Sequence, residues 1–127
     1  DRSRMASEAQ HQAAVIKWSQ QPEIRHRWPE LMLLYHIPNG GTRDPVEAKH
    51  LKQQGVKPGV PDLHLPVARG GYHGLYIEMK TETGRATKDQ LWWGEQLLRG
   101  GYQWKICHGW MAAVAALTEY LTLSGPR

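Results

Sequence analysis

The sequence predicts an α/β fold in which helices flank a four-stranded mixed sheet, in the order α-β-α-β-β-α-β-α. Some segments carry apolar residues at helical spacing, others alternate apolar and polar residues as strands do, and glycine or proline separates most of them. The chain has 127 residues, of which 40% are hydrophobic, enough for one modest core. We therefore expect one domain over residues 1–127. We interpret residues 1–4, which precede the internal Met5, as a cloning remnant.

The first third of the chain is predicted to hold one helix and one strand. The helix spans residues 7–19, and its apolar stripe consists of Ala6, Ala9, Ala13 and Ile16. An irregular piece follows, bracketed by Pro22 and Pro29. The apolar run 31–37 is predicted to be a strand, because Pro38 and two glycines stop it.

The remaining elements are predicted to alternate. In chain order we expect a helix at 44–54, strands at 62–65 and 75–80, a helix at 87–99, a strand at 102–107 and a last helix from 110 to before 125. Asp44 and Pro45 suit the N-cap and the first position of their helix. Thr87 and Gln90 have capping-box spacing. The two strands at 62–65 and 75–80 are predicted to pair as a hairpin.

Composition narrows the class of protein only slightly. The chain has 16 basic and 12 acidic residues, a net charge of +4 with neutral histidines, which fits a polyanionic partner without requiring one. No run of about 18 apolar residues predicts a membrane span, and no apolar stretch near the start suggests a signal peptide. The single cysteine agrees with a reducing compartment. The seven histidines show no spacing typical of a zinc site.

Charged residues occupy one face of the predicted hairpin. Side chains alternate across a strand, so Glu78 and Lys80 share one face, and pairing of the strands brings Asp62 to that face too. Two converging carboxylates form a hard oxygen site of the kind Mg²⁺ prefers, and the backbone carbonyl of Met79 is a further candidate ligand. His64 lies on the face of Asp62 and is expected at the rim.

Such a group has the equipment to hydrolyse a phosphodiester. A metal can activate water and stabilise the leaving oxygen, while Lys80 can hold the water or neutralise phosphate charge. The alternative is a solvated sheet face with a Glu–Lys pair along one strand. That alternative is weakened because "PGVP" fixes the chain just before Asp62.

The chain resembles a known nuclease family along nearly its whole length. The order P-D, fifteen residues, E-x-K is the pattern of the PD-(D/E)XK nucleases. Within them the chain is similar to the VRR-NUC family, in the stretches "SEAQHQAAVIKW", "HIPNGGTR", "QGVKPGVPDL", "LYIEMK" and "TKDQLWW". The resemblance implies a restriction-endonuclease-like core and cleavage of DNA that depends on Mg²⁺, with Mn²⁺ as a substitute, leaving a 5′-phosphate and a 3′-hydroxyl.

The resemblance also implies roles for individual residues. Asp62 and Glu78 would bind metal, Lys80 would be catalytic, and Glu8 would be a further acid, acting directly or through water. Gln90 would lie beside the active site. Two alternatives stay open: Glu8 as an ordinary exposed helix acid, and Gln90 as no more than the partner in its capping box, although the two roles of Gln90 are compatible.

Candidate DNA contacts surround these residues in the sequence. Asn39 and Arg43 belong to the loop "PNGGTR", whose glycines allow close approach to a phosphate, although a plain turn is the alternative. Arg85 and Lys88 are further phosphate candidates. Three more lysines are better explained as a solvated helix face: Lys49, Lys52 and Lys57.

The predicted function is a metal-dependent, structure-specific endodeoxyribonuclease. The resemblance is to the compact, stand-alone form of the family from phages and bacteria, so we expect the cytoplasm of a bacterial or phage-infected cell. A homodimer acting on branched DNA, above all four-way Holliday junctions, would supply the two sites that paired nicks require. The alternatives are a nuclease of flaps, single strands or specific duplex sites, a non-catalytic DNA-binding module, and a small α/β protein with no DNA-related role.

Overall fold

The four strands of the protein form one mixed sheet. The computed structural model describes residues 6–39 and 43–126. The elements in chain order are α1 (Glu8–Ser19), α2 (Pro22–Arg27), η2 (Pro29–Leu33, a 3-10 helix), β1 (Tyr35–His36), α3 (Pro45–Gln53), β2 (Leu63–Leu65), β3 (Leu75–Lys80), α4 (Lys88–Arg99), β4 (Gln103–His108) and α5 (Trp110–Leu121). The strand order is β1-β2-β3-β4, and β3 and β4 are parallel while the other pairs are antiparallel. The predicted fold class is therefore confirmed.

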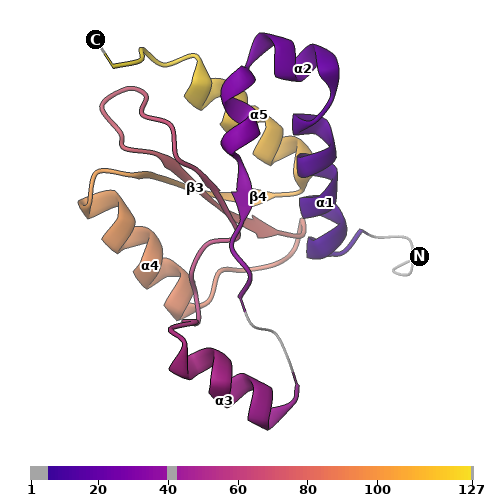
Figure 1. Ribbon diagram of the computed structural model, residues 1–127, viewed down its shortest axis with the longest axis vertical. Helices are drawn as coiled ribbons and strands as arrows, with labels where there is room; N and C mark the ends of the chain where they lie inside the picture. The colour runs from indigo at the N-terminus through magenta and orange to yellow at the C-terminus, as the bar shows by residue number, and fades with distance from the viewer. Residues whose placement is uncertain (1–5, 40–42, 127) are drawn as a thin grey trace.

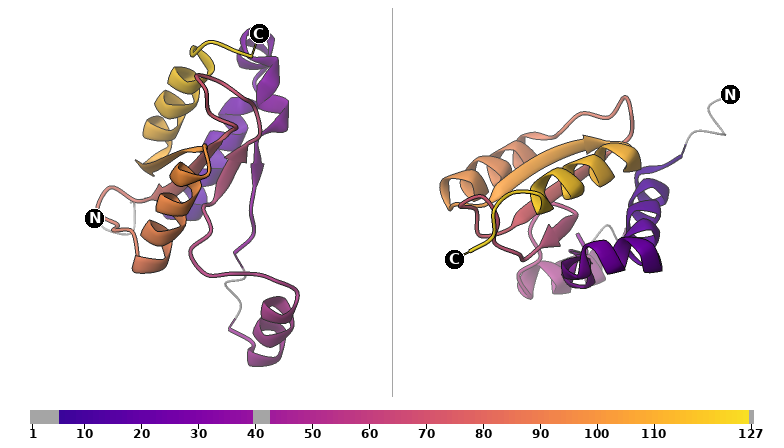
Figure 2. Two further views of the ribbon diagram at one scale, coloured as in Figure 1. Left: turned by 90° about the vertical axis from the view of Figure 1, so that its left-hand side faces the viewer. Right: turned by 90° about the horizontal axis from the view of Figure 1, so that it is seen from above.

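Helices cover both faces of this sheet. Helices α1 and α5 pack together and against β3 on one face, while α4 packs on β4 from the other (Figures 1 and 2). Helix α3 projects away from the sheet at one end of the molecule. Within the described ranges, no helix is both long and apolar enough to cross a membrane.

The hydrophobic core lies between the sheet and the pair α1–α5. Its strand residues are Leu63, Leu65, Leu75, Ile77 and Met79 of β2 and β3, which alternation along each strand places on one face, and Cys107 of β4. Val15 of α1 and Leu117 of α5 are fully buried against them. Burying one such side chain contributes about 1.5–3 kcal/mol. The alternation of β3 thus determines which of its residues remain for the opposite face.

The buried face of α1 differs from the predicted stripe. Ala9 and Ala13 are exposed, whereas the buried residues His11, Val15 and Ser19 follow one another at four-residue spacing. The prediction was wrong because alanine buries little area and does not select a face, while the larger Val15 does.

The segment 22–37 was also predicted wrongly. Pro22 begins α2 instead of an irregular piece, because proline is favoured at the first position of a helix. The apolar run forms most of η2, and only Tyr35–His36 is a strand. Leu31 is buried and Leu34, three residues later, is partly buried against the core, whereas Met32 and Leu33 between them are exposed. The later strands agree more closely with the prediction: β3 has the predicted bounds, and the ends of β2 and β4 shift by no more than one residue.

Candidate active site

The pairing of β2 with β3 brings two acids together. Leu63 lies opposite Ile77 in the antiparallel register, and Asp62 directly precedes this pair. The Asp62 N–H also donates to the carbonyl of Ile77, at 3.0 Å, and this bond holds Asp62 beside β3 next to Glu78. The predicted hairpin and the convergence of the two acids are therefore present in the structure.

The segment before Asp62 is fixed by close packing. Gly59 has φ +89, and a Cβ built on it would lie 2.6 Å from the backbone of Asp89 near the start of α4. Only glycine fits such a contact in this backbone conformation. Pro61 is fully buried. The chain therefore enters β2 at a set angle, with the start of α4 pressed against it.

A third acid comes from the start of α1. Ser7 caps this helix, with a capping box in which Ser7 and Gln10 bond to each other's backbone N–H. Glu8 follows the cap in the first turn, where an acidic side chain is favoured by the helix dipole. Carboxylate oxygens of Glu8, Asp62 and Glu78 all lie within 4.8 Å of one another. The structure thus groups Glu8 with the two strand acids.

Glu78 is a buried acid with an incomplete set of hydrogen bonds. It is 2% exposed, and its Oε2 accepts a hydrogen bond from Gln90 Nε2 at 3.2 Å. Its Oε1 is buried and has no partner among the residues that the structure describes. Burial, followed by the proximity of the Asp62 carboxyl group, raises the pKa of Glu78 to about 9.

Gln90 performs two structural tasks at once. Its Oε1 accepts from the backbone N–H of Thr87 at 2.8 Å and completes the capping box of α4, as predicted. Its Nε2 donates to Glu78. The cap and the position beside the acids, which the sequence left as alternatives, therefore occur together.

Lys80 lies on the same face of β3 as Glu78. It is 6% exposed, and its positive charge favours the ionised form of Glu78, against the effect of burial on that pKa. The alternative of a solvated sheet face does not hold for these two residues, because both are buried. A charge in such a place needs compensation from its neighbours.

The backbone of Met79 contacts Asp62 through its N–H group. Its backbone N–H donates to Asp62 Oδ2 at 2.7 Å, which orients that carboxylate. The predicted role of its carbonyl as a metal ligand stays a prediction.

The predicted DNA contacts are exposed. Asn39 donates from Nδ2 to the carbonyl of Val60 at 3.3 Å, which ties its loop to the segment before β2. The side chains of Arg43, Arg85 and Lys88 are exposed as well, and Lys88 is the first residue of α4. The loop residues 40–42 lie outside the described residues.

His64 belongs to a row of aromatic rings. Its ring stacks on that of Tyr76 with centroids 4.1 Å apart, and its Nδ1 is 2.8 Å from the hydroxyl of Tyr35. Burial lowers the pKa of His64, so the ring is neutral at physiological pH. It therefore contributes no positive charge beside Asp62.

Sequence reasoning did not identify His11 as important. Its side chain is buried, and its Nδ1 accepts a hydrogen bond from the backbone N–H of Trp110 at the start of α5. Its Nε2 lies 3.9 Å from a carboxylate oxygen of Glu82. His11 thus joins α1, one turn after Glu8, to the last helix. No sequence signal distinguishes it from the other histidines.

The acid group fits a divalent cation. The carboxylates of three residues converge, and one of them, Glu78, carries a buried oxygen without a hydrogen-bond donor among the described residues. Hard oxygen ligands of this kind suit Mg²⁺. Without a cation, burial and then the nearby charges of Asp62 and Glu8 raise the pKa of Glu78 and keep it protonated at neutral pH. A bound cation would offset the repulsion between these carboxylates and favour the ionised form of Glu78.

A mixed sheet with this acid group and a lysine at one end of its central hairpin is consistent with a restriction-endonuclease-like fold. The sequence profile of the VRR-NUC domain matches residues 6–111. A solved structure described as a VRR_NUC domain protein is 31% identical, with a TM-score of 0.78, and the match covers 96% of this chain and 93% of that one. No curated protein sequence matches significantly. The chain belongs to the VRR-NUC family, a family of nucleases.

Proposed function

We propose that the protein is a metal-dependent, structure-specific endonuclease that hydrolyses DNA phosphodiesters. The observation that supports this most strongly is the convergence of Glu8, Asp62 and Glu78 next to the buried Lys80. Asp62 and Glu78 would hold Mg²⁺, or Mn²⁺ in its place, with Glu8 and the Met79 carbonyl as further ligands. The bound metal would supply Lewis acidity toward the phosphate and a lowered pKa for water.

Each residue of the site then has its own task. Lys80 holds the attacking water by hydrogen bonding and balances negative charge on the phosphate. Gln90 orients Glu78 through its amide N–H. The Met79 N–H orients Asp62. Because both carboxylates are held by other groups, they need little reorganisation when the substrate binds.

The substrate we propose is branched DNA, above all the four-way Holliday junction that the family resemblance implies. One chain carries one such acid group among its described residues, and symmetric nicks in two strands need two groups. A two-fold homodimer would provide them. The exposed Asn39, Arg43, Arg85 and Lys88 would contact phosphates around the cleavage point.

A cleavage panel tests the proposal. Purified protein is incubated with a four-way junction, a flap, single-stranded DNA and linear duplex, in Mg²⁺, Mn²⁺ or EDTA. We expect paired nicks in the junction with either metal and none in EDTA. Cleavage of flaps, single strands or fixed duplex sites instead would replace the junction with that substrate.

Two variants assign the chemistry to the site. Asp62→Asn keeps the size of the side chain but weakens metal binding, and Lys80→Ala removes the ammonium group, so both should lower the cleavage rate by at least about 100-fold. Wild-type rates in Asp62→Asn would reject the assigned site. If wild type and Lys80→Ala both bind DNA and both leave every substrate uncut, the protein is a DNA-binding module.

A further inference from the structure

Helix α3 stands apart from the rest of the protein. It projects from the body, and none of its nine residues is buried (Figure 1). Val46 in its first turn is 62% exposed. Isolated helices of this length are marginal in water. The cap that Asp44 makes to the N–H of Val46 supports α3 locally, but the helix lacks the packing that stabilises helices in a core.

The segment around α3 is rich in exposed positive charge. Residues 43–57 contain four lysine or arginine residues and two acids. The four basic residues are all exposed: Arg43, Lys49, Lys52 and Lys57. One of the acids, Asp44, caps the helix. The segment is thus more basic than the chain as a whole and suits a polyanion better than a second basic copy of itself.

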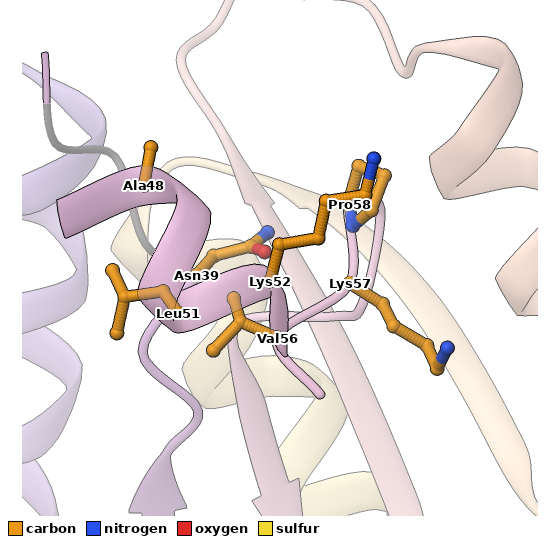
Figure 3. A pocket seen from close by; sticks show the side chains of 7 residues that line it. All are labelled: Asn39, Ala48, Leu51, Lys52, Val56, Lys57 and Pro58. Atoms are coloured by element: carbon orange, nitrogen blue, oxygen red, sulfur yellow. The ribbon is translucent and has the colours of Figure 1, made fainter. Parts of the chain in front are cut away.

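A pocket of about 450 Å³ lies between α3 and the segment that returns from it. Leu51 and Val56 form part of its apolar lining (Figure 3), and the Val56 N–H donates to the Leu51 carbonyl at 3.0 Å. Lys52 extends toward Pro58, while Lys57 points away from the helix. An apolar lining with ammonium groups at its edge matches the sugar–phosphate backbone of DNA, which combines apolar sugar surface with anionic phosphate.

The location of α3 connects this surface to the candidate active site. In Figure 1 the starts of α1 and α4 lie toward the same end of the molecule as α3. The return segment runs directly from the pocket into Asp62, and the carbonyl of Pro58 accepts a hydrogen bond from Trp93 Nε1 of α4 at 3.1 Å. The close contact between Gly59 and Asp89 fixes it further. A DNA duplex bound at α3 would therefore continue into the candidate active site.

We propose that α3 and residues 54–58 form an arm that binds the sugar–phosphate backbone of the substrate DNA away from the cleaved phosphate. The arm uses Lys52 and Lys57 for phosphate contacts. This inference rests on the proposed function for the identity of the polyanion. It replaces the expectation that these lysines form only a solvated helix face.

Salt dependence of binding tests the arm directly. Lys52→Gln and Lys57→Gln are combined in a Lys80→Ala background, in which we expect cleavage at least about 100-fold slower than in wild type. The Kd for a four-way junction is measured over a series of salt concentrations. Each lost phosphate contact lowers the slope of log Kd against log salt by about 1, so we expect a reduction of about 2. Glutamine keeps good helix propensity, so α3 should remain folded.

The matched control removes the same charge at the opposite end of the molecule, through Lys17→Gln and Arg27→Gln in the same background. We expect its slope to stay within about half a unit of the parent. An equal reduction in the control, or no reduction in the arm variant, would overturn the proposal. If circular dichroism shows lost helix in the arm variant, the charge-keeping variant Lys52→Arg with Lys57→Arg must show the parent slope, or the arm is rejected.

This experiment is independent of cleavage. An arm-dependent slope in a protein that cuts none of the four DNA substrates would reject the nuclease proposal and keep the arm. Cleavage of DNA together with an unchanged slope in the arm variant would keep the nuclease proposal and reject the arm.

Discussion

Replacing Glu78 by glutamine should make the metal-free protein more stable at alkaline pH. Glutamine has nearly the same shape and can still accept the hydrogen bond from Gln90 Nε2. It cannot ionise in the unfolded state, however, so its folding at alkaline pH does not require the uptake of a proton. Comparing the variant with wild type thus separates the contribution of ionisation to the free energy of unfolding from the contribution of side-chain packing.

The magnitude follows from the raised pKa of Glu78. The pKa rises from 4.5 to about 9 in the folded chain, because burial and the nearby Asp62 disfavour the charged form. Between these values the folded state holds a proton that the unfolded state has released, so stability falls as the pH rises. The slope is about 1.4 kcal/mol per pH unit, which amounts to about 5 kcal/mol by about pH 8. At about pH 5 the loss is below about 1 kcal/mol.

Urea denaturation in EDTA, followed by circular dichroism from about pH 5 to pH 8, measures this difference. We expect Glu78→Gln to exceed wild type by several kcal/mol at the alkaline end and to match it closely at the acidic end. Glu119→Gln, at an exposed position of α5, should track wild type throughout. A stability difference between Glu78→Gln and wild type that does not change with pH would refute the reasoning.

Other predictions concern packing and the two tasks of Gln90. Gly94→Ala should destabilise the fold by about 2–4 kcal/mol in urea denaturation, because its Cβ would lie 2.3 Å from the indole ring of Trp104 in β4. Gly100→Ala, where a Cβ meets no close neighbour, should change stability by less than about 1 kcal/mol. Thr87→Ala and Gln90→Ala should each cost about 1 kcal/mol through the lost cap, but only Gln90→Ala should also lower the cleavage rate beyond its effect on stability. The single cysteine is buried with its pKa raised to about 11, so a thiol reagent should modify it at the rate of unfolding and not faster.

The strand pair at the centre of the site was predictable because its signal is local. Alternation in residues 75–80 assigns Leu75, Ile77 and Met79 to the core, and the short connection to 62–65 leaves antiparallel pairing as the natural arrangement. These two facts suffice to bring Asp62 and Glu78 together. The capping box of α4 was equally local, since it depends on spacing within one turn.

Features that depend on distant contacts were not predictable. The buried face of α1 is determined by its packing on α5 and β3. The alanine-rich sequence of α1 does not indicate which face that is. The burial of His11 depends on a hydrogen bond to Trp110, across 99 positions of sequence. The conversion of the run 31–37 into η2 is stabilised by the ion pair of Glu30 with Arg69, again from a distant segment.

The bond between His11 and Trp110 also bears on how the protein is made. Synthesis runs from the N-terminus, so Glu8 leaves the ribosome long before α5, the helix on which α1 packs. A nascent chain that ends before Trp110 should therefore lack the helix that holds α1, and Glu8 with it, beside the sheet. We expect the complete acid group to assemble only after α5 has emerged. Metal-dependent protection of ribosome-bound chains of increasing length, measured by proteolysis, would show whether it does.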